Sequence, residues 1–365
     1  LRQRLGRSGR RKGESAILRG YCIEDALAVD SSLNALLRLG TVQMAAQISL
    51  LLENWFEPPR VQGTHMSTLI QQVLSAIAQT GGATAGQLYT LLCAPGCPFS
   101  RVSRAEFIEL LRHLGQKELL VQDSSGVLLH GRVGEKFVNH YSFYAAFAAD
   151  EEFRLVTGGK TLGTVPVSQM MTIGQRILFA GKTWRVDEVD APQKTIYVTH
   201  TSGGVPPLFS GGAGRTHSRV RQRMRQLLEE SAVPTYLDET AARFLAQARE
   251  YYKRMDLSTR VVIDQGAEVM LMTWLGDSAN EAIACLLIRR GFTAAPAGPG
   301  VEVLKSQHTT DEILDALIDA AIDEPPPLDV LLENVQNLQR EKWDWALPDG
   351  LLRKAYASHY LDLAE

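Results

Sequence analysis

The chain has 365 residues and a formal net charge of −3, with 45% apolar and 22% charged residues. This length allows about two to four small domains, and the composition is that of an ordinary soluble globular protein. No apolar run approaches the roughly 20 residues that a membrane-spanning helix needs, and no signal peptide is visible. We therefore expect a cytoplasmic chain with no membrane partner.

The cysteines and histidines predict neither a disulfide framework nor a metal site. The four cysteines, Cys22, Cys93, Cys97 and Cys285, are few and scattered, as in proteins of a reducing compartment. Cys93 and Cys97 have no second Cys/His pair near them, so two small buried thiols are favoured there over a zinc site.

The small net charge hides a strong asymmetry along the chain. Residues 1–20 contain seven Lys/Arg and one Glu, residues 215–225 contain five arginines and no acid, and residues 306–365 contain thirteen acids and four bases. A nucleic-acid-binding protein need not be basic overall if its basic residues gather on the contact surface. The two basic stretches are therefore candidate contact regions.

The first basic stretch is a regular arginine-glycine motif. Arg4, Arg7 and Arg10 recur at a spacing of three, and Gly6 and Gly9 each directly precede one of the last two arginines. Arginines three apart on a helical turn or tight loop point their guanidinium groups the same way. Glycines let a ligand approach the backbone closely. The arrangement suits a polyphosphate and the charge of a transferring phosphoryl group, whereas the alternative is a disordered basic tail.

With Gln3 included, the stretch reads Q-R-x-G-R-x-G-R and resembles the last conserved motif of superfamily 2 helicases. The resemblance implies that Arg7 and Arg10 approach the phosphates of ATP and act in catalysis. It also implies supporting positions around the nucleotide for Gln3, Arg4, Gly6 and Gly9.

A phosphate loop of the form G-x-x-x-x-G-K-[ST] and a D-E-x-H box are both missing from this sequence. ATP and Mg²⁺ would therefore be bound mainly by another motor domain. Because the chain starts with Leu1 at the edge of the motif, we expect the C-terminal portion of a longer helicase, inactive as an ATPase by itself.

Residues 1–24 are expected to end the second RecA-like motor domain, with a strand over 14–24. Residues 25–64 are expected to form a helical connector. Seven apolar positions at helical spacing predict a helix over 41–55. Pro58 and Pro59 follow it and cannot continue a helix.

Residues 65–148 predict a winged-helix domain, with three helices over 66–79, 84–92 and 103–114 and a β-hairpin over 119–130. The third helix is the usual nucleic-acid reader of such folds. Arg101, Ser103 and Arg104 at its start are therefore candidate phosphate contacts. The alternative is a domain that only packs against its neighbours.

Residues 149–305 predict a β-barrel-like core domain, because short strands alternate evenly with turns. Trp184 in one of them is either a core residue or a stacking platform for an unpaired base, which is worth about 1–3 kcal/mol. We expect the strands after residue 256 to complete the barrel and residues 216–256 to be a helical insert. The first five strands are predicted over 153–156, 163–166, 176–179, 183–186 and 195–198.

The second basic stretch is a helix whose arginines have no acid within the stretch. They are either neutralised by a phosphate backbone, which the sequence favours, or paired with the acidic C-terminal helices. The five candidates for nucleic-acid contacts are Arg215, Arg219, Arg221, Arg223 and Arg225.

Residues 306–365 predict acidic C-terminal helices over 309–323 and 328–340, with a last helix after Pro348. The segments 140–147, 162–166, 178–190 and 203–211 resemble the large helicase-related (Lhr-type) family of superfamily 2 DNA helicases, and their order and spacing agree with that family. The stretch 342–357 resembles its closing helices.

The resemblance implies an α+β multidomain protein: the end of a RecA-like domain, a winged helix, a small β-barrel and C-terminal helices. It implies an ATP-dependent DNA helicase or translocase, and a winged-helix and barrel platform for single-stranded or tailed duplex DNA. We expect a monomer. The alternatives are a non-catalytic winged-helix adaptor that binds nucleic acid, and an RNA helicase of the same superfamily.

Overall fold

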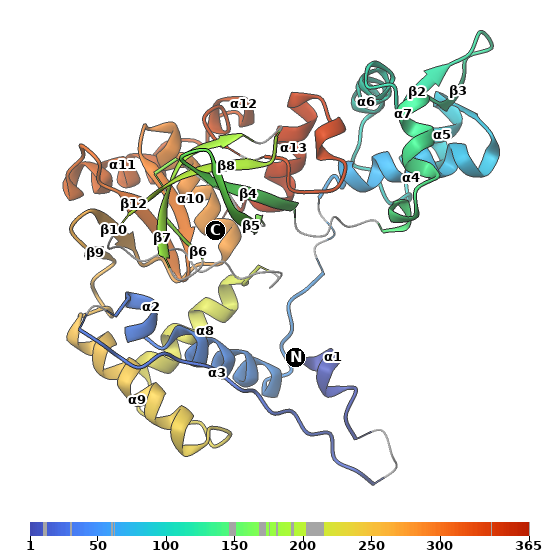
Figure 1. Cartoon of the computed structure of the whole chain (residues 1–365). Coiled ribbons are helices and arrows are strands. Elements are labelled where there is room, and N and C mark those ends of the chain that lie inside the picture. Colours follow the sequence, from blue (N-terminus) through green and yellow to red (C-terminus); the bar gives the residue numbers. More distant parts are fainter. Residues whose placement is uncertain are drawn as a thin grey trace.

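The chain has an α+β fold with separate sheets and helical layers (Figure 1). The computed structural model describes residues 1–9, 13–29, 31–59, 61, 63–145, 151–167, 173–174, 176–179, 182–190, 193–201, 215–336 and 338–364. Among these residues, no helix is both long and apolar enough to span a bilayer.

The N-terminal part is a helical layer preceded by an extended segment (Figure 1). Helices α1 (Arg2–Leu5), α2 (Leu33–Leu36) and α3 (Leu39–Leu52) come first, and α3 packs with α8 (Ser218–Glu229) and α9 (Glu239–Arg254) around a shared apolar core. The prediction of α3 is confirmed, although it ends at Leu52 before the prolines are reached. The strand predicted over 14–24 is wrong, because the described backbone there is extended and pairs with no other strand.

Residues 66–144 form a compact unit with the predicted helices and hairpin. The helices are α4 (Met66–Thr80), α5 (Ala85–Leu92) and α6 (Arg104–Gln116), followed by strands β2 (Leu120–Gln122) and β3 (Val127–His130). A short strand β1 (Ala83–Thr84) pairs with β3, and α7 (Arg132–Val138) and η1 (Tyr141–Tyr144) close the unit. Thr84 and Ser103 are the N-caps of α5 and α6, each in a complete capping box.

The core of this unit also contains residues from the far end of the chain. Side chains of η2 (Asp344–Ala346) and α13 (Asp349–Tyr360), together with neighbouring residues, are buried in the same cluster as α4, α5 and α6. They are Trp343, Ala346, Leu347, Leu351, Leu352 and Ala355. The C-terminal segment is therefore part of this unit's core rather than a separate acidic tail.

Five of the predicted strands form one sheet in the order β5-β4-β8-β7-β6. They are β4 (Glu151–Thr157), β5 (Lys160–Val167), β6 (Arg176–Phe179), β7 (Lys182–Asp190) and β8 (Thr195–His200). Their neighbours pair antiparallel except β4 and β8, which run parallel. Between the two outer strands β5 and β6 the described residues form no ladder, so the sheet stays open.

The later strands do not complete a barrel, and that prediction is wrong. Strands β9 (Val262–Asp264), β10 (Glu268–Leu271), β11 (Thr293–Ala297) and β12 (Gly300–Leu304) form their own antiparallel sheet in the order β11-β12-β10-β9. Their apolar side chains are buried against α10 (Asp277–Arg289) and α11 (Thr310–Ile322). This sheet therefore has its own apolar core and does not pair with the first sheet. Helices α8 and α9 pack on α3 and are not an insert in a barrel.

The C-terminal helices differ from the prediction at one place. Helix α11 and the helix after Pro348, α13, are confirmed, but the helix predicted over 328–340 is only α12 (Leu328–Leu331). After α12 the described backbone is irregular and carries Arg340 and Trp343 into the interior. The side chains of these two residues need partners on different elements, which a continued helix would not reach.

Candidate functional site

The described residues of the arginine-glycine motif lie on α1 and in the turn after it. Gln3, Gly6 and Arg7 are exposed, whereas the side chain of Arg4 and the whole of Arg10 lie outside the described residues. Gly9 adopts φ +61°, and a Cβ at this position would lie 2.6 Å from the backbone N of Ala16. Only glycine therefore fits this turn, which folds the motif back against the next segment.

The segment after the motif is extended and exposes large apolar side chains. Tyr21 is 83% exposed and Ile23 is 98% exposed, and Ile17 and Val29 are also on the surface. The segment is tied down at its end, where Glu24 Oε1 accepts hydrogen bonds of 2.7 Å from both the backbone N–H and the hydroxyl of Thr41. Among the described residues this extended backbone pairs with no strand, so these apolar side chains stay exposed.

At the start of α6, where a phosphate contact was predicted, side chains of this chain cap the free backbone N–H groups. Ser103 Oγ accepts from the N–H of Glu106 at 3.3 Å, and the Glu106 carboxylate accepts in return from the Ser103 N–H at 2.9 Å. Lys354 of α13 pairs with the same carboxylate. Burial acts to raise the pKa of Glu106, but Lys354 and Ser103 outweigh it and hold the pKa below its usual value. Ser103 is therefore a cap, and its role as a phosphate contact is corrected.

The two arginines predicted beside Ser103 are exposed. Arg101 lies on the surface just before the helix, and the guanidinium of Arg104 lies 5.0 Å from the ring centre of Tyr89 on α5. A cation stacked on an aromatic ring keeps most of its hydrogen-bond donors free for another partner. Arg101 and Arg104 are therefore exposed just before α6 and at its first residue.

The arginines of the second basic stretch pair with carboxylates of this chain. Arg215 lies 2.6 Å from Glu281, and Arg221, which is 6% exposed, lies 3.1 Å from Asp277. Both carboxylates belong to α10. These two arginines join α10 to α8 and to the residues before it, and they are not placed to bind a phosphate backbone.

The other three arginines of α8 are paired at its surface. Arg219 lies 3.5 Å from Glu53, Arg223 lies 2.5 Å from Glu230, and Arg225 lies 2.9 Å from Glu229. Each of the five candidates, Arg215, Arg219, Arg221, Arg223 and Arg225, thus has a carboxylate partner in this chain, and phosphate binding by the exposed ones stays a prediction. These carboxylates lie in 53–281 and not in the acidic C-terminal helices.

Trp184 is a core residue of the five-stranded sheet. It is 8% exposed, its Nε1–H donates to the carbonyl of Phe179 at 3.2 Å, and His200 contacts its ring edge to face. Stacking a base requires an open ring face. Its assignment as a stacking platform is therefore corrected to the alternative, a packed core side chain.

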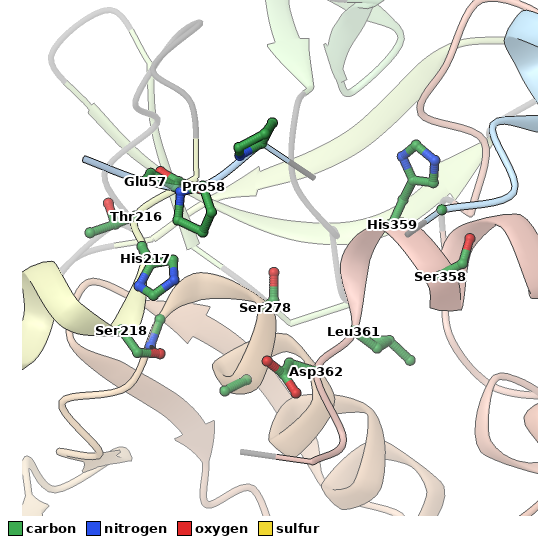
Figure 2. Close-up of a pocket in the computed structure, with 14 residues that line it drawn as sticks. Glu57, Pro58, Thr216, His217, Ser218, Ser278, Ser358, His359, Leu361 and Asp362 are labelled. Carbon is green, nitrogen blue, oxygen red and sulfur yellow. Dashed lines mark hydrogen bonds between the residues drawn. The ribbon is translucent and has the colours of Figure 1, made fainter. Parts of the chain in front are cut away.

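A polar cavity of about 290 Å³ lies where the starts of α8 and α10 meet the end of α13 (Figure 2). His217 and His359 lie on opposite sides of it in this view. Its hydroxyl groups join the helices to one another: Ser218 Oγ accepts from the Gly276 N–H at 2.7 Å, and Ser278 Oγ accepts from Arg215 at 3.0 Å. The residues that line this cavity include none of those predicted to bind ATP or nucleic acid.

A buried ion network lies beside the cavity, and the sequence did not predict it. Glu281, which is 3% exposed, accepts from Arg215 at 2.6 Å, from Arg340 at 2.7 Å and from the Tyr356 hydroxyl at 2.6 Å. Burial acts to raise the pKa of Glu281, but Arg340 and Arg215 hold it below its usual value. The partners are 59 to 75 residues from Glu281 in the sequence, with Glu281 in the middle of α10, so no local pattern identifies them.

Among the described residues, no group of three or more His, Cys, Asp or Glu side chains is placed to hold a metal ion. No family model, curated protein or solved structure matches this chain. The features that bear on function are the arginine motif, the extended segment and the exposed residues at the start of α6.

Proposed function

We infer that this chain is the C-terminal part of an ATP-dependent DNA helicase or translocase. Arg7 and Arg10 would reach ATP and Mg²⁺ held mainly by a motor domain outside this chain, with Gln3, Arg4, Gly6 and Gly9 around the nucleotide. The chain itself would hydrolyse no ATP. Positioned arginines of this kind speed phosphoryl transfer by about 10³–10⁵.

The observation that carries this proposal is the exposure of the motif together with the segment that follows it. Arg7 is exposed, and Tyr21 and Ile23 expose apolar side chains from an extended backbone. Burying the two side chains in a sheet would remove apolar surface from water, which is favourable by about 25 cal/mol per Å². A sheet that took up this segment would place a second domain directly beside the arginines.

Residues 66–144 would be a winged helix that contacts the nucleic acid. The order of helices, the β2–β3 hairpin and the short strand β1 support this assignment. Arg101 and Arg104 would contact phosphates from the start of α6 and the residues before it, without the arginines of α8 and without Trp184. The track would be single-stranded or tailed duplex DNA.

The proposal is tested on the gene product that contains this chain, by measuring DNA-stimulated ATP hydrolysis. Arg7→Ala should lower kcat by about 10³ or more, because positioned arginines stabilise the charge of the transferring phosphoryl group. Arg2→Ala is the matched control, since Arg2 lies on α1, just before the turn that carries Arg7, with its guanidinium 4.6 Å from the Phe56 ring centre. Equal activity of Arg7→Ala and the parent would reject the motor role.

A protein that binds nucleic acid but never hydrolyses ATP would instead support the non-catalytic adaptor. The choice of track needs a second measurement. The protein is titrated with single-stranded DNA and RNA of one sequence at one salt concentration, since affinities at different salt are not comparable. Equal or tighter binding of RNA would replace DNA as the proposed track.

A further inference from the structure

One side of α11 packs on the chain, and the opposite side is open to solvent. Ile313 and Ala316 are buried in the core that this helix shares with α10 and the four-stranded sheet. Leu314, Ile318 and Ile322 recur every four residues, so they form an apolar stripe along the other side of the helix. Leu314 is partly buried, whereas Ile318 is 53% and Ile322 is 78% exposed. Helix α11 lies at the left edge of the molecule in Figure 1.

A stripe of aspartates runs along the helix beside the apolar stripe. Asp311, Asp315 and Asp319 are also four residues apart, and all three are exposed. Carboxylates at this spacing lie next to one another and repel, whereas a lysine in place of one of them would attract its neighbours. Within the part of the chain that the structure describes, none of these three aspartates forms an ion pair. We call the apolar stripe and the aspartate stripe together the open face of α11.

The basic side chains at the two ends of α11 already have acidic partners. At the start, Lys305 lies 2.5 Å from Asp264, which also accepts from the hydroxyl of Thr310 at 2.9 Å. Just past the end, Arg290 lies 2.7 Å from Asp323. The sequence supplies no further cation locally, because residues 306–339 contain eight acids and no lysine or arginine. The charge of the aspartate stripe is therefore left for a partner, unlike that of the arginines in 215–225.

We propose that the open face of α11 binds a basic amphipathic helix of a partner protein. Apolar side chains of that helix would cover Ile318 and Ile322, and lysines or arginines beside them would pair with Asp315 and Asp319. Single exposed apolar side chains are ordinary on protein surfaces. Here they are aligned with acids at the same spacing, so one helix of the right pattern can contact both stripes at once. The apolar contacts supply the affinity, and the charges fix the orientation.

The negative charge of the open face decides between classes of partner. Carboxylates repel the phosphates of nucleic acids and of anionic lipids. A second copy of this chain docked through the same face would set aspartates against aspartates, since a two-fold interface brings identical patches together. A lysine- or arginine-rich helix has the opposite charge and the matching apolar spacing. Because α11 has only 13 residues, the interface is small and the binding is weak and reversible.

The test is the binding of a fluorescein-labelled leucine/lysine amphipathic peptide of about 18 residues, which is long enough to form a helix. The full chain is titrated into the peptide, and fluorescence anisotropy is measured. Binding should be saturable and should weaken as salt is added, because salt screens exposed ion pairs. A peptide of the same composition in scrambled order should bind more weakly by about ten-fold or more, since it presents no continuous apolar stripe.

Variants of the open face separate the two stripes. Ile318→Ser combined with Ile322→Ser should weaken binding by about ten-fold or more, because the apolar anchors are lost. Asp315→Asn combined with Asp319→Asn should weaken binding and flatten its salt dependence. All four side chains are exposed, so both double variants should keep the circular dichroism spectrum of the parent.

Ile108→Ser on α6 is the matched control. Ile108 is a 44% exposed helical isoleucine, but Arg104 and Arg112 lie one turn before and after it in place of acids. This change should leave peptide binding as in the parent. The proposal is overturned if the parent does not bind the peptide, if the scrambled peptide binds equally, or if Ile108→Ser weakens binding as much as the double isoleucine variant. A dimer of the parent in sedimentation that Ile318→Ser with Ile322→Ser abolishes would assign the face to a second copy instead.

Discussion

The backbone N–H of Trp343 donates to Oγ of Ser67 at 2.9 Å, across 276 residues of sequence. The indole N–H of the same residue donates to Gln71 Oε1 at 3.4 Å, so the Trp343 side chain is bonded to α4 as well as packed against it. This relationship makes the C-terminal segment part of the core of residues 66–144. It also explains why the backbone leaves helical geometry between α12 and η2.

Replacing Trp343 should therefore destabilise a unit that lies far away in the sequence. Trp343→Ala removes one of the largest fully buried side chains and should lower the free energy of unfolding by about 3–5 kcal/mol. The measurement is urea unfolding followed by circular dichroism. Tyr144→Ala is the control, because Tyr144 is 96% exposed and should change stability by less than about 0.5 kcal/mol. Equal effects of the two changes would contradict this account.

The Glu281 network should be sensitive to removal of its acid. Glu281→Ala removes the buried carboxylate that Arg340 and Arg215 share and should cost about 3–5 kcal/mol in urea unfolding. Asp323→Ala also breaks an arginine pair, but the Asp323 side chain is 63% exposed. Its cost should stay near or below about 1 kcal/mol. A small loss in Glu281→Ala would show that the network adds little to stability.

The two sets of arginines should differ in the salt dependence of single-stranded DNA binding. Each phosphate contact that is lost flattens the slope of log affinity against log salt by about 0.7. Arg101→Ala and Arg104→Ala should each produce this change, whereas Arg225→Ala should not, because Arg225 is paired with Glu229 at 2.9 Å. The measurement is fluorescence anisotropy at several salt concentrations. A flatter slope only in Arg225→Ala would return the contact surface to α8.

Asp264 provides a pH-dependent prediction in the four-stranded sheet. Lys305, 2.5 Å away, and the Gly266 N–H and the Thr310 hydroxyl lower the pKa of Asp264 to about 2 from its ordinary value of 3.8. The lowered pKa means that this ion pair stabilises the fold above about pH 4 and that its effect is lost as the pH falls toward 2.

Lys305→Met should therefore raise the titration midpoint of the Asp264 carboxyl toward 3.8, as measured by carbon NMR. Lys354→Met is the control. Lys354 pairs with Glu106 in another part of the chain, so its loss should leave the Asp264 midpoint unchanged. An unchanged midpoint in Lys305→Met would assign the low pKa to the other two donors.

The local elements could be predicted where their signals lie within a few residues. Thr84 and Ser103 mark helix starts because each caps its own backbone, and the five strands of the first sheet follow from alternation and turns. The prediction of a strand over 14–24 was wrong because pairing with a neighbour is not a local property. Its side chains fit a strand, but a strand also needs a neighbour, and the described chain supplies none.

The candidate site was predicted less well than the elements. The five arginines of 215–225 looked unneutralised because their carboxylates, from Glu53 to Glu281, lie outside the stretch or on another helix. The pairs of Arg215, Arg219 and Arg221 depend on how α3, α8 and α10 pack together, whereas Arg223 and Arg225 pair with acids at the end of α8 itself. A window of sequence shows the charges but not the neighbours.

By itself, the sequence determined the α+β composition and most helix and strand positions, because these depend on local backbone and side-chain preferences. Only the tertiary structure decided that the two sheets stay separate, that Trp184 is buried, and that Trp343 and Arg340 return to cores built from earlier residues. Those outcomes depend on which apolar faces and charges meet across long stretches of chain, since burial is shared between elements and not encoded within one of them.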